Sequence, residues 1–445
     1  MMKNTVLIIG AGAAGLMAAH ALAKAGKKVT VLEARKRIGG RIHTLSDESF
    51  FKHTELGAEF IHGDLPVTLA LLKEANLPYR PASAEMMRYE NGSFDGGQGI
   101  IEDWDLLIDK LSQLQTDISI NDFLLQEFPG DKYQDLRTSV WNFVSGYDTA
   151  DPCLASAFAL RNEWEHDEMD AQHRIDGGYG RLMNYLASNC KANGGEIILN
   201  AVVKEIRWEA GKVTAIATDG DEYQGAQLLI AMPLGVLKAA AGELGAISFS
   251  PAIPAHSQAM QQMGFGSVIK ILFEFTEPFW LDSRSEDIAG KSIKEMGYLF
   301  SDEEIPTWWT QMPEQSNVLT GWIGGPAAAE KATLPDEVIS QQALQSLANI
   351  FKQDVAELKD KLLASRIMNW TTDPFTRGSY GYDTVEAPEA RKVLCTPVDD
   401  TIYFCGEYLY DGTAMGTVEA ALSSGADVAK KMLSNYDESW STYHY

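Results

Sequence analysis

A glycine-rich turn near the start of the chain constrains the fold more than any other feature. Residues 5–10, TVLIIG, are an apolar run typical of a β-strand, and residues 11–26, AGAAGLMAAHALAKAG, have the composition of a helix that ends at its last glycine. A second strand-like run, KKVTVLEA, follows at residues 27–34. A strand, a helix and a second strand in this order predict a βαβ unit, and therefore an α/β protein with a parallel sheet.

Three glycines of this unit, Gly10, Gly12 and Gly15, stand in G-x-G-x-x-G register. The first allows a tight turn, the second lets a pyrophosphate approach the backbone, and the third lets the helix pack closely on the strand. The helix N-terminus then offers amide donors to the phosphates. Glu33 follows about 20 residues later, where a carboxylate can accept hydrogen bonds from both ribose hydroxyls. The pattern predicts a dinucleotide site, and the alternative is a glycine-rich turn that binds no ligand.

Length and composition describe a globular protein of more than one domain. At 445 residues the chain is too long for a single core of ordinary size, so two or three domains are expected. A formal net charge of −25 disfavours nucleic acids and anionic membranes as partners, and favours small cationic molecules. The four cysteines show neither CxxC pairing nor metal-ligand spacing, which favours a reduced, cytoplasmic protein and no metal site.

The first 25 residues imitate a secretory signal peptide, because a lysine is followed by an apolar run with an A-x-A-like end. Glycines interrupt that run at a regular spacing and a second strand follows at once, so we expect no signal peptide. No other stretch approaches the ~18 uninterrupted apolar residues that a membrane span requires.

Four further motifs occur along the chain. They are EARKRIGGRIHT at residues 33–44, ELGAEFIHG at 55–63, NAVVKEIRW at 200–208 and CGEYLYDGTAMGTVEAALSSGADVAKKML at 405–433. In order and approximate spacing these motifs resemble the flavin amine oxidase superfamily, which includes monoamine oxidases, polyamine oxidases, L-amino acid oxidases and lysine-specific histone demethylases. The resemblance touches both ends and the middle of the chain.

The resemblance implies FAD, held by a Rossmann-like domain of the glutathione-reductase type. In the family the GG-R segment wraps the pyrophosphate, and the G-A-x-x-I-H-G segment passes beside the flavin ring through its backbone. An acidic residue near the phosphate and ribitol region matches Glu407, and a valine whose backbone contacts adenine matches Val203. The cofactor residues implied in this way are Gly10, Gly12, Ala13, Ala14, Gly15, Glu33, Ala34, Arg35, Gly40, Arg41, Gly57, Ala58, Glu59, Phe60, Val203, Glu407, Gly416, Thr417 and Val418.

The cofactor domain must be discontinuous, because its motifs are separated in sequence. We expect it to be assembled from residues of about 1–80, 190–250 and 390–435. The intervening segments, 81–189 and 251–389, are expected to form an α+β substrate domain, with residues 436–445 as a loosely held tail.

A lysine interrupts an apolar run at residues 264–275, GFGSVIKILFEF. Strand alternation places on one face Ile269, Ile271, Phe273 and Phe275, and on the other Val268, Lys270, Leu272 and Glu274. From the strand alone Lys270 marks a solvated face, since lysines are seldom buried. In the family, a lysine on a strand of this character points at flavin N5 and holds a water there. The resemblance therefore implies that Lys270 positions this water and assists proton transfer or flavin reoxidation by oxygen.

Three more residues are candidates for contact with the substrate. NWTTDPFTRGSYGY, at residues 369–382, resembles the family segment that carries a tryptophan and then a G-x-Y turn close to the flavin. Trp370 matches that tryptophan, and Tyr380 matches one of the two aromatic residues that sandwich the amine in monoamine oxidases. His62 matches a histidine at the pocket entrance of polyamine oxidases. The plainer alternatives are core packing for Trp370 and a hydrogen bond to nearby backbone for His62.

Two departures from monoamine oxidases affect the expected cofactor linkage and substrate. Ser379 stands where those enzymes carry the cysteine that bonds the flavin, so FAD is expected to be non-covalent. Thr417 stands where they carry the second aromatic residue, which fits polyamine oxidases or other bacterial relatives better. The acidic run NEWEHDEMD, at residues 162–170, could attract a distal ammonium, although a solvated loop or helix face is the plainer interpretation.

The function implied is oxidation of a small-molecule amine. A hydride equivalent passes from the carbon that bears nitrogen to flavin N5, and O2 accepts the electrons and yields H2O2. The imine hydrolyses to an aldehyde or ketone and to ammonia or a smaller amine. The alternatives are another FAD oxidoreductase of this fold, such as a carotenoid desaturase or protoporphyrinogen oxidase, and a flavoprotein without turnover. The sequence leaves open which amine is oxidised, whether O2 or another molecule accepts the electrons, and how the chain assembles.

Overall fold

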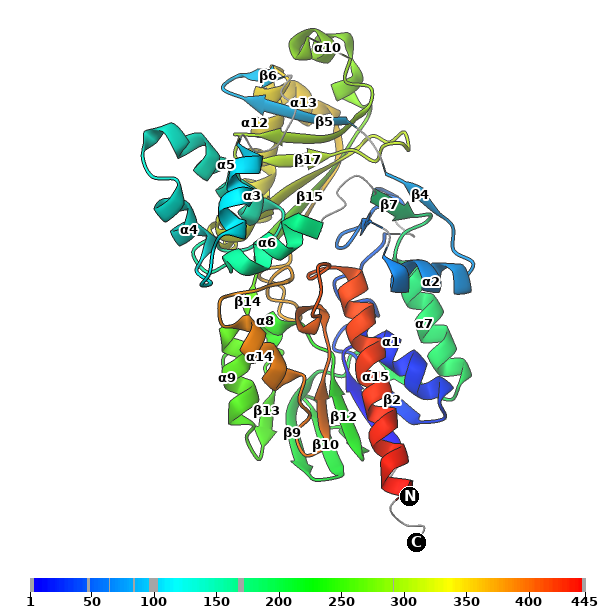
Figure 1. Cartoon of the computed structure of the whole chain (residues 1–445). Coiled ribbons are helices and arrows are strands. Elements are labelled where there is room, and N and C mark those ends of the chain that lie inside the picture. Colours follow the sequence, from blue (N-terminus) through cyan, green and yellow to red (C-terminus); the bar gives the residue numbers. More distant parts are fainter. Residues whose placement is uncertain are drawn as a thin grey trace.

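The computed structural model describes residues 4–45, 49–63, 65–82, 85–95, 103–166, 172–290 and 292–441. Two units lie one above the other, a lower α/β unit around a parallel sheet and an upper unit around a larger sheet (Figure 1). Both ends of the chain lie at the base of the lower unit (Figure 1). Among the described residues, no helix has both the length and the apolar character to cross a membrane.

The lower unit is built on a five-stranded parallel sheet. Across the sheet the strands are β21 (Ile402–Phe404), β12 (Gln227–Ile230), β1 (Thr5–Ile9), β2 (Lys28–Leu32) and β8 (Glu196–Ile198). One face is covered by α1 (Ala13–Lys24), α7 (Gly180–Ala192) and α15 (Val418–Ser441). The strands are largely apolar because both faces of the sheet are covered. The predicted βαβ unit and parallel sheet are confirmed.

The second face of the parallel sheet packs against a smaller sheet and two helices. The smaller sheet contains β11 (Glu222–Gly225), β10 (Lys212–Ala217), β9 (Val203–Glu209) and β13 (Ser248–Ser250). The helices are α9 (Pro254–Gln262) and α14 (Ala387–Leu394). All of these elements contribute to one apolar core beneath the parallel sheet.

Helices α7 and α9 belong to the lower unit, whereas the predicted boundaries assign most of α7 and all of α9 to the substrate domain. The boundary at residue 190 places residues 180–189 of α7 in the substrate domain, yet Leu182 and Leu186 of this helix are buried in the lower unit's core. The boundary at residue 251 does the same for α9, whose Met260 is buried beneath the parallel sheet. Apolar periodicity predicts a helix but not the layer against which it packs, so sequence could not place these boundaries. Helix α15 also continues through residues 436–441 of the predicted tail.

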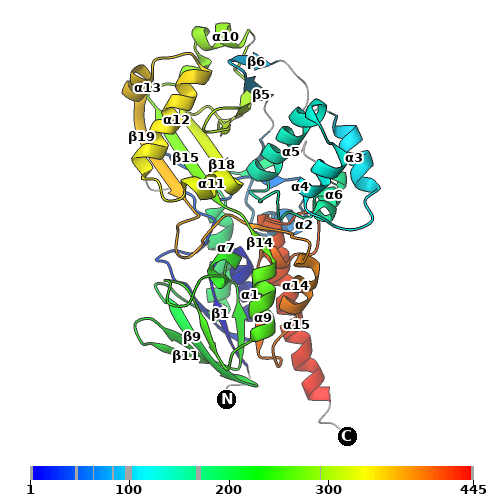
Figure 2. The ribbon, with the colours of Figure 1, turned by 90° about the vertical axis from the view of Figure 1, so that its left-hand side faces the viewer.

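The upper unit is built on a seven-stranded sheet. Its strands are, in order, β19 (Leu362–Asn369), β15 (Val268–Phe275), β18 (Val318–Gly324), β17 (Thr307–Trp309), β16 (Met296–Ser301), β5 (Glu85–Glu90) and β6 (Ser93–Asp95). Helices α12 (Asp336–Ile350) and α13 (Val355–Lys361) pack on one face, as Figure 2 shows. The other face lies toward the lower unit and a group of helices.

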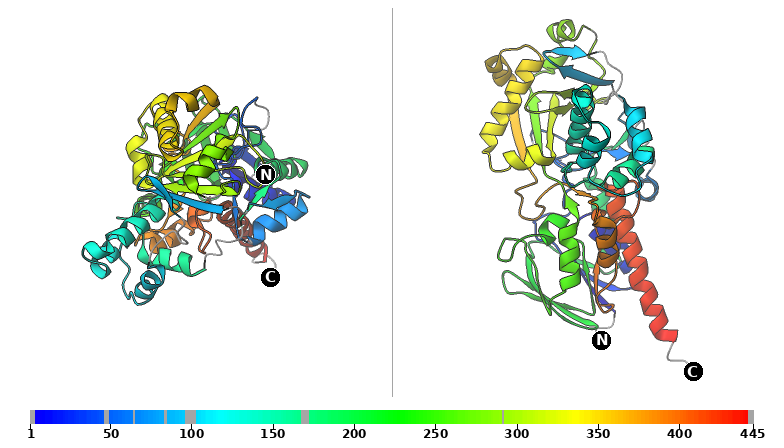
Figure 3. Two further views of the ribbon diagram at one scale, coloured as in Figure 1. Left: turned by 90° about the horizontal axis from the view of Figure 1, so that it is seen from above. Right: turned by 60° about the vertical axis from the view of Figure 1, so that its left-hand side comes forward.

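That helical group has a core of its own. It consists of α3 (Trp104–Ser112), α4 (Ile120–Glu127), η1 (Asp131–Tyr133), α5 (Gln134–Gly146) and α6 (Ala157–His166). Seen from above, this group and α12 lie on opposite sides of the large sheet (Figure 3). The remaining elements are β3 (Ile61–His62), α2 (Pro66–Glu74), β4 (Tyr79–Pro81), β7 (Gln172–Ile175), α8 (Leu234–Leu237), β14 (Gly264–Phe265), η2 (Phe279–Leu281), α10 (Ser283–Ala289), α11 (Gly325–Lys331), β20 (Gly381–Tyr382) and η3 (Glu407–Leu409).

Strand β15 lies inside the large sheet, paired on its two edges with β18 and β19. Ile269, Ile271 and Phe273 are buried in the core that α12 covers. Lys270 lies on the opposite face and is only 1% exposed. The predicted alternation of the strand is confirmed, and the alternative of a solvated face for Lys270 is wrong.

Candidate active site

A single cavity connects the glycine-rich turn of the lower unit to the large sheet of the upper unit. Its volume is about 1450 Å³. Pockets for drug-sized ligands usually have ~300–1,000 Å³, so this cavity has room for a dinucleotide and a second small molecule. Every candidate residue from the sequence except Gly15 lines it, including Lys270, His62, Trp370 and Tyr380.

The N-terminus of α1 opens onto this cavity. The helix begins at Ala13 without a side-chain cap, so the amides of its first turn have no acceptor within the helix. A Cβ on Gly15 would lie 2.0 Å from the carbonyl oxygen of Gly10, so Gly15 allows helix and strand to touch and does not reach the cavity. A Cβ on Gly12 would meet no atom within 4 Å. The turn is therefore an open backbone cradle with free amide donors, which suits a pyrophosphate.

Glu33 is held at the end of β2 with its carboxylate against the cradle. Its Oε2 accepts from the Ala11 amide at 2.8 Å and its Oε1 accepts from the Arg35 amide at 2.9 Å. Burial raises the pKa of Glu33, and the two amide hydrogen bonds act against that shift. Each carboxylate oxygen retains a further acceptor position, so the group suits two ribose hydroxyls.

Segments far apart in the sequence meet beside Arg41. Its Nη1 donates to Glu407 Oε1 and to the carbonyl oxygen of Ser379, both at 2.7 Å. A Cβ on Gly57 would lie only 1.7 Å from the carbonyl oxygen of Arg41. This close approach requires glycine at position 57 and fixes residues 57–60 along the cavity wall. The cradle, the acid of β2 and this glycine-dependent wall together fit an FAD.

Lys270 belongs to a buried network of charges in the wall of the cavity. Its Nζ donates to Glu59 Oε2 at 2.8 Å and to the carbonyl oxygen of Gly57 at 3.2 Å. The other carboxylate oxygen of Glu59 pairs with Arg174 Nη2 at 3.0 Å. The side chains of Lys270, Glu59 and Arg174 are 1%, 4% and 8% exposed. Burial alone would raise the pKa of Glu59, but the two cations hold it below its usual value, so Glu59 is ionised.

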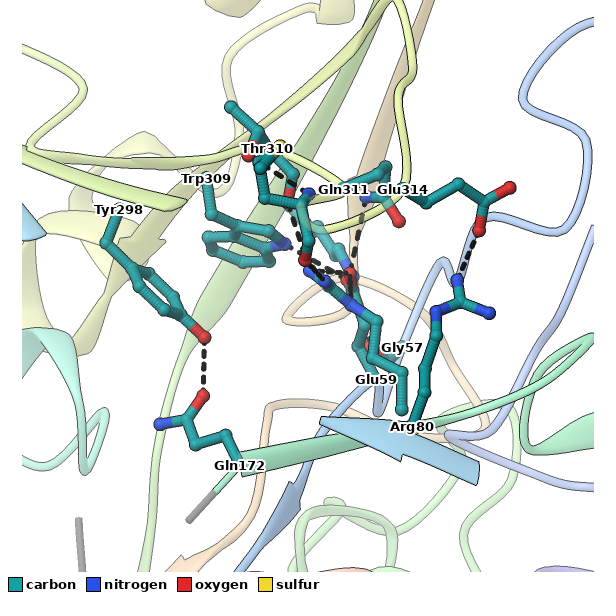
Figure 4. A network of polar contacts seen from close by, with 12 residues as sticks. Gly57, Glu59, Arg80, Gln172, Tyr298, Trp309, Thr310, Gln311 and Glu314 are labelled. Carbon is teal, nitrogen blue, oxygen red and sulfur yellow. Dashed lines mark hydrogen bonds and ion pairs between the residues drawn. The ribbon is translucent and has the colours of Figure 1, made fainter. Parts of the chain in front are cut away.

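Sequence reasoning missed much of this network. It assigned Glu59 a backbone contact only, whereas the side chain of Glu59 supplies the counter-charge of Lys270. Trp309 donates from Nε1 to Glu59 Oε2 at 3.1 Å, and its ring centroid lies 5.2 Å from Lys270 Nζ. Tyr298, on the neighbouring strand, donates to Gln172 Oε1 at 2.5 Å (Figure 4). The signal available in the sequence was the lysine itself, because a buried ammonium requires a carboxylate partner.

Aromatic side chains form much of the remaining wall. Trp370 is 3% exposed and donates from Nε1 to the carbonyl oxygen of Leu56 at 2.9 Å. Tyr380 donates its hydroxyl proton to the carbonyl oxygen of Tyr147. The ring of His62 lies 6.0 Å from that of Tyr147, and burial lowers the pKa of His62 to about 4. His62 is therefore neutral at pH 7 and brings no positive charge to the cavity.

The acidic run at residues 162–170 lies only partly within the described residues, because 167–170 fall outside them. Glu163, near its start, lines the cavity. Thr417, which stands where monoamine oxidases carry the second aromatic residue, also lines the cavity, and its Oγ1 accepts from the Ala420 amide at 3.2 Å. At this position the cavity wall therefore carries a hydroxyl group and a methyl group in place of an aromatic ring.

Known proteins resemble this chain over nearly its whole length. A family model described as flavin containing amine oxidoreductase matches residues 13–122 and 103–433. Polyamine oxidase 4 of Oryza sativa subsp. japonica is 29% identical over 464 residues, covering 96% of this chain and 89% of that protein. Lysine-specific histone demethylase 1 homolog 3 of the same plant is 28% identical, covering 96% of this chain and 54% of that protein. The chain spans about half the length of the demethylases that it matches.

Solved structures share the fold at low sequence identity. A putrescine oxidase with bound putrescine superimposes with a TM-score of 0.77 at 20% identity, covering 97% of this chain and 99% of that one. Cyclohexylamine oxidase from Brevibacterium oxydans IH-35A gives a TM-score of 0.79 at 20% identity with the same coverage. The extent of the family match and the agreement of fold and cradle lead to one assignment: this chain belongs to the flavin-containing amine oxidoreductase family.

Proposed function

We propose that the protein oxidises a small primary or secondary amine with non-covalent FAD and passes the electrons to O2. For a primary amine, RCH2NH2, O2 and H2O give RCHO, NH3 and H2O2. The observation that carries this proposal is Lys270, a buried and ion-paired lysine in the wall of a cavity that continues into a dinucleotide cradle. Burial of a lysine is energetically unfavourable, and buried, ion-paired groups of this kind are concentrated at functional sites.

The cofactor would be held by residues from several separate segments of the chain. The first turn of α1, with Gly12, Ala13 and Ala14, would bind the pyrophosphate together with Gly40 and Arg41. Glu33 would bind ribose and Val203 would contact adenine. The remaining contacts would come from Ala34, Arg35, Gly57, Ala58, Glu59, Phe60, Glu407, Gly416, Thr417 and Val418, all of which line the cavity.

A non-covalent linkage is supported by the position of Ser379. It stands where covalent attachment would need a cysteine, and its Oγ lies 2.5 Å from Thr149 Oγ1 in a buried hydrogen bond. Bound FAD supplies the redox chemistry, by accepting a hydride equivalent from the carbon next to nitrogen. The protein's part is to orient the amine, exclude water and manage protons.

The walls of the cavity favour the form of the amine that can react. An ammonium has no lone pair to support the forming C=N bond, so the substrate must lose a proton first. Burial among Trp370, Tyr380 and Trp309 disfavours the charged form of an amine. Lys270 is ion-paired with Glu59 and His62 is uncharged, so neither side chain presents a bare positive charge to a second, distal ammonium. We assign Lys270 to hold a water near the reacting centre and to pass protons.

Anaerobic bleaching of the flavin tests the function. The purified yellow protein is mixed without oxygen with separate monoamines, diamines and polyamines, N-methylated lysine peptides and amino acids, and the flavin absorbance is followed. Rapid bleaching by one class supports the proposal and identifies the substrate class. If dithionite bleaches the flavin and no amine does, the proposed function is wrong.

The role of Lys270 is tested with Lys270→Met. Glu59 keeps Arg174 as an ion partner in this variant, so the protein is expected to fold and to bind flavin. We expect the rate of flavin reduction or reoxidation to fall by ~10²-fold or more, the usual contribution of a positioned proton-transfer group. The matched control is Lys238→Met, because Lys238 is a half-buried lysine whose Nζ donates to the Met263 carbonyl oxygen at 2.8 Å, outside the cavity. Equal rates in the two variants would remove Lys270 from the mechanism.

A further inference from the structure

A second cavity, of about 190 Å³, adjoins the buried network that contains Lys270. We call it the rear cavity. Glu59 lines both this cavity and the main one. Figure 4 shows Glu59 between Tyr298 and Gln172, which line the main cavity, and the Arg80–Glu314 ion pair, which lines the rear cavity. A water molecule takes up ~30 Å³ in the liquid, so the rear cavity has room for several.

Glu55 lines the rear cavity with a carboxyl group that is only half satisfied. Its Oε1 accepts from the Tyr179 amide at 2.7 Å and from Thr44 Oγ1 at 2.8 Å. Its Oε2 is buried and has no hydrogen-bond partner among the described residues, and the whole residue is 4% exposed. An unsatisfied buried oxygen is unfavourable unless it meets water or carries a proton. Glu55 is one of the residues that line the rear cavity, where water can be held.

The surroundings of Glu55 allow it to exchange a proton near neutral pH. On the rim of the rear cavity the charged and titratable groups are Lys52, His53, Arg80 and Glu314. Toward the main cavity they are Glu59, Arg174 and Lys270, with the hydroxyl of Tyr179, which immediately precedes α7. Burial raises the pKa of Glu55 to about 7, against the hydrogen bonds from Thr44 and Tyr179.

The proposed reaction consumes a proton, and Lys270, the group proposed to deliver it, is buried away from the solvent. Conversion of O2 to H2O2 takes two electrons and two protons. Both electrons and one proton come from the reduced cofactor, so the second proton must come from the protein. Lys270 is 1% exposed and its Nζ is hydrogen-bonded to Glu59, so a proton that Lys270 gives up must be replaced through the network or through the substrate cavity.

We propose that waters in the rear cavity, together with Glu55 and Glu59, form a route by which Lys270 regains protons from the solvent behind the substrate cavity. This inference rests on the proposed function, which gives Lys270 a proton to pass. Glu55 lines the rear cavity and not the main one, and it would act through Glu59 and Lys270, so it is a positioning residue for the proton. The route ends at the Arg80–Glu314 pair, whose side chains are 34% and 59% exposed.

Glu55→Gln removes the ionisable group and little else. The amide oxygen of glutamine can accept from the Tyr179 amide and from Thr44, as Glu55 Oε1 does. The control is Thr44→Val, which removes one of the same hydrogen bonds and keeps the carboxyl group. Flavin in each protein is reduced without oxygen by stoichiometric dithionite and then mixed with O2, so the test does not depend on the identity of the amine.

In the wild-type protein and in Thr44→Val we expect reoxidation to slow as pH rises through the pKa of Glu55. In Glu55→Gln we expect reoxidation to be about tenfold slower below that pH and to lose this pH dependence. A Glu55→Gln protein with the wild-type rate and pH profile overturns the inference. Because dithionite replaces the amine, this result and the bleaching result can fail separately.

Infrared spectroscopy supplies a readout that needs neither turnover nor a variant with normal flavin binding. Wild-type protein should show the band of a protonated carboxyl group that disappears between about pH 5 and pH 9 and shifts in D2O. Glu55→Gln should lack this band. A wild-type protein without a titrating carboxyl band in that range overturns the inference, even if the variant fails to fold.

Discussion

Replacement of Glu59 by glutamine is the strongest test of the charge network. Glu59 lies between Lys270 and Arg174, whose side chains are 1% and 8% exposed. At separations of 2.8 and 3.0 Å and an effective dielectric constant of ~20, each attraction amounts to ~6 kcal/mol before desolvation is subtracted. Glutamine keeps the shape of the side chain but leaves two cations buried without their counter-charge. Removal of one partner of a buried pair usually costs ~3–5 kcal/mol.

Thermal unfolding of the flavin-loaded protein measures this cost. An unfolding entropy of ~2.1 cal/mol/K per residue makes 1 kcal/mol worth about 1 °C for a chain of this length that unfolds as one unit. We therefore expect the Tm of Glu59→Gln to fall by about 3–5 °C. In a Lys270→Met background one of the stranded cations is absent, so the same substitution should cost less, with a coupling energy of ~1.5–3 kcal/mol in the double-mutant cycle.

Glu314→Gln is the matched control, because Glu314 pairs with Arg80 but its side chain is 59% exposed. Exposed ion pairs contribute ~0–1 kcal/mol, so its Tm should change by about 1 °C at most. If Glu59→Gln is no less stable than Glu314→Gln, or if the cycle gives no coupling with Lys270, the ionic account of this wall is refuted.

Three further perturbations have expected outcomes. Burial raises the pKa of Glu55 to about 7, so between pH 5 and 7 the folded chain keeps a proton that the unfolded chain has lost. Stability should therefore fall by about 2.5 kcal/mol from pH 5 to pH 8, and Glu55→Gln should abolish that part of the loss in a comparison of Tm at the two pH values. Gly57→Ala would place a methyl group 1.7 Å from the carbonyl oxygen of Arg41, so the protein should purify without flavin, and a yellow product would contradict this. Glu33→Ala frees the Ala11 amide and removes the ribose acceptor, so the Kd for FAD in a fluorescence titration should rise ~10–100-fold, whereas an unchanged Kd would exclude Glu33 from the site.

The parts of the site that sequence predicts are those set by local spacing. The cradle follows from the glycines at positions 10, 12 and 15, because a short turn between a strand and a helix leaves few backbone paths. The side of β15 on which Lys270 lies follows from strand alternation. In both cases the informative residues are close in sequence, so geometry follows from the pattern. The burial of Lys270 did not follow from the strand, and required the resemblance to a family.

The parts that sequence did not predict depend on contacts between distant segments. The carboxylate of Glu59 receives hydrogen bonds from Lys270, Arg174 and Trp309, which are separated from it by 211, 115 and 250 residues. No local pattern around any of them indicates the other members. The same limitation applies to α7, because no local pattern in its sequence indicates that it packs against α1.

The network also explains how the two units are held in register at the site of chemistry. Lys270 belongs to the sheet of the upper unit, whereas Glu59 follows Gly57, whose close contact with Arg41 fixes it beside the cofactor cradle. The Lys270–Glu59 ion pair therefore sets the position of the lysine relative to the cradle, in a region too dry for a loose or solvated contact. A lysine at position 270 without an acid at position 59 would be a buried charge without its ion partner, and an acid without the lysine would rely on Arg174 alone. The two residues are one functional unit, and a substitution at either should be tolerated best when the other is replaced with it.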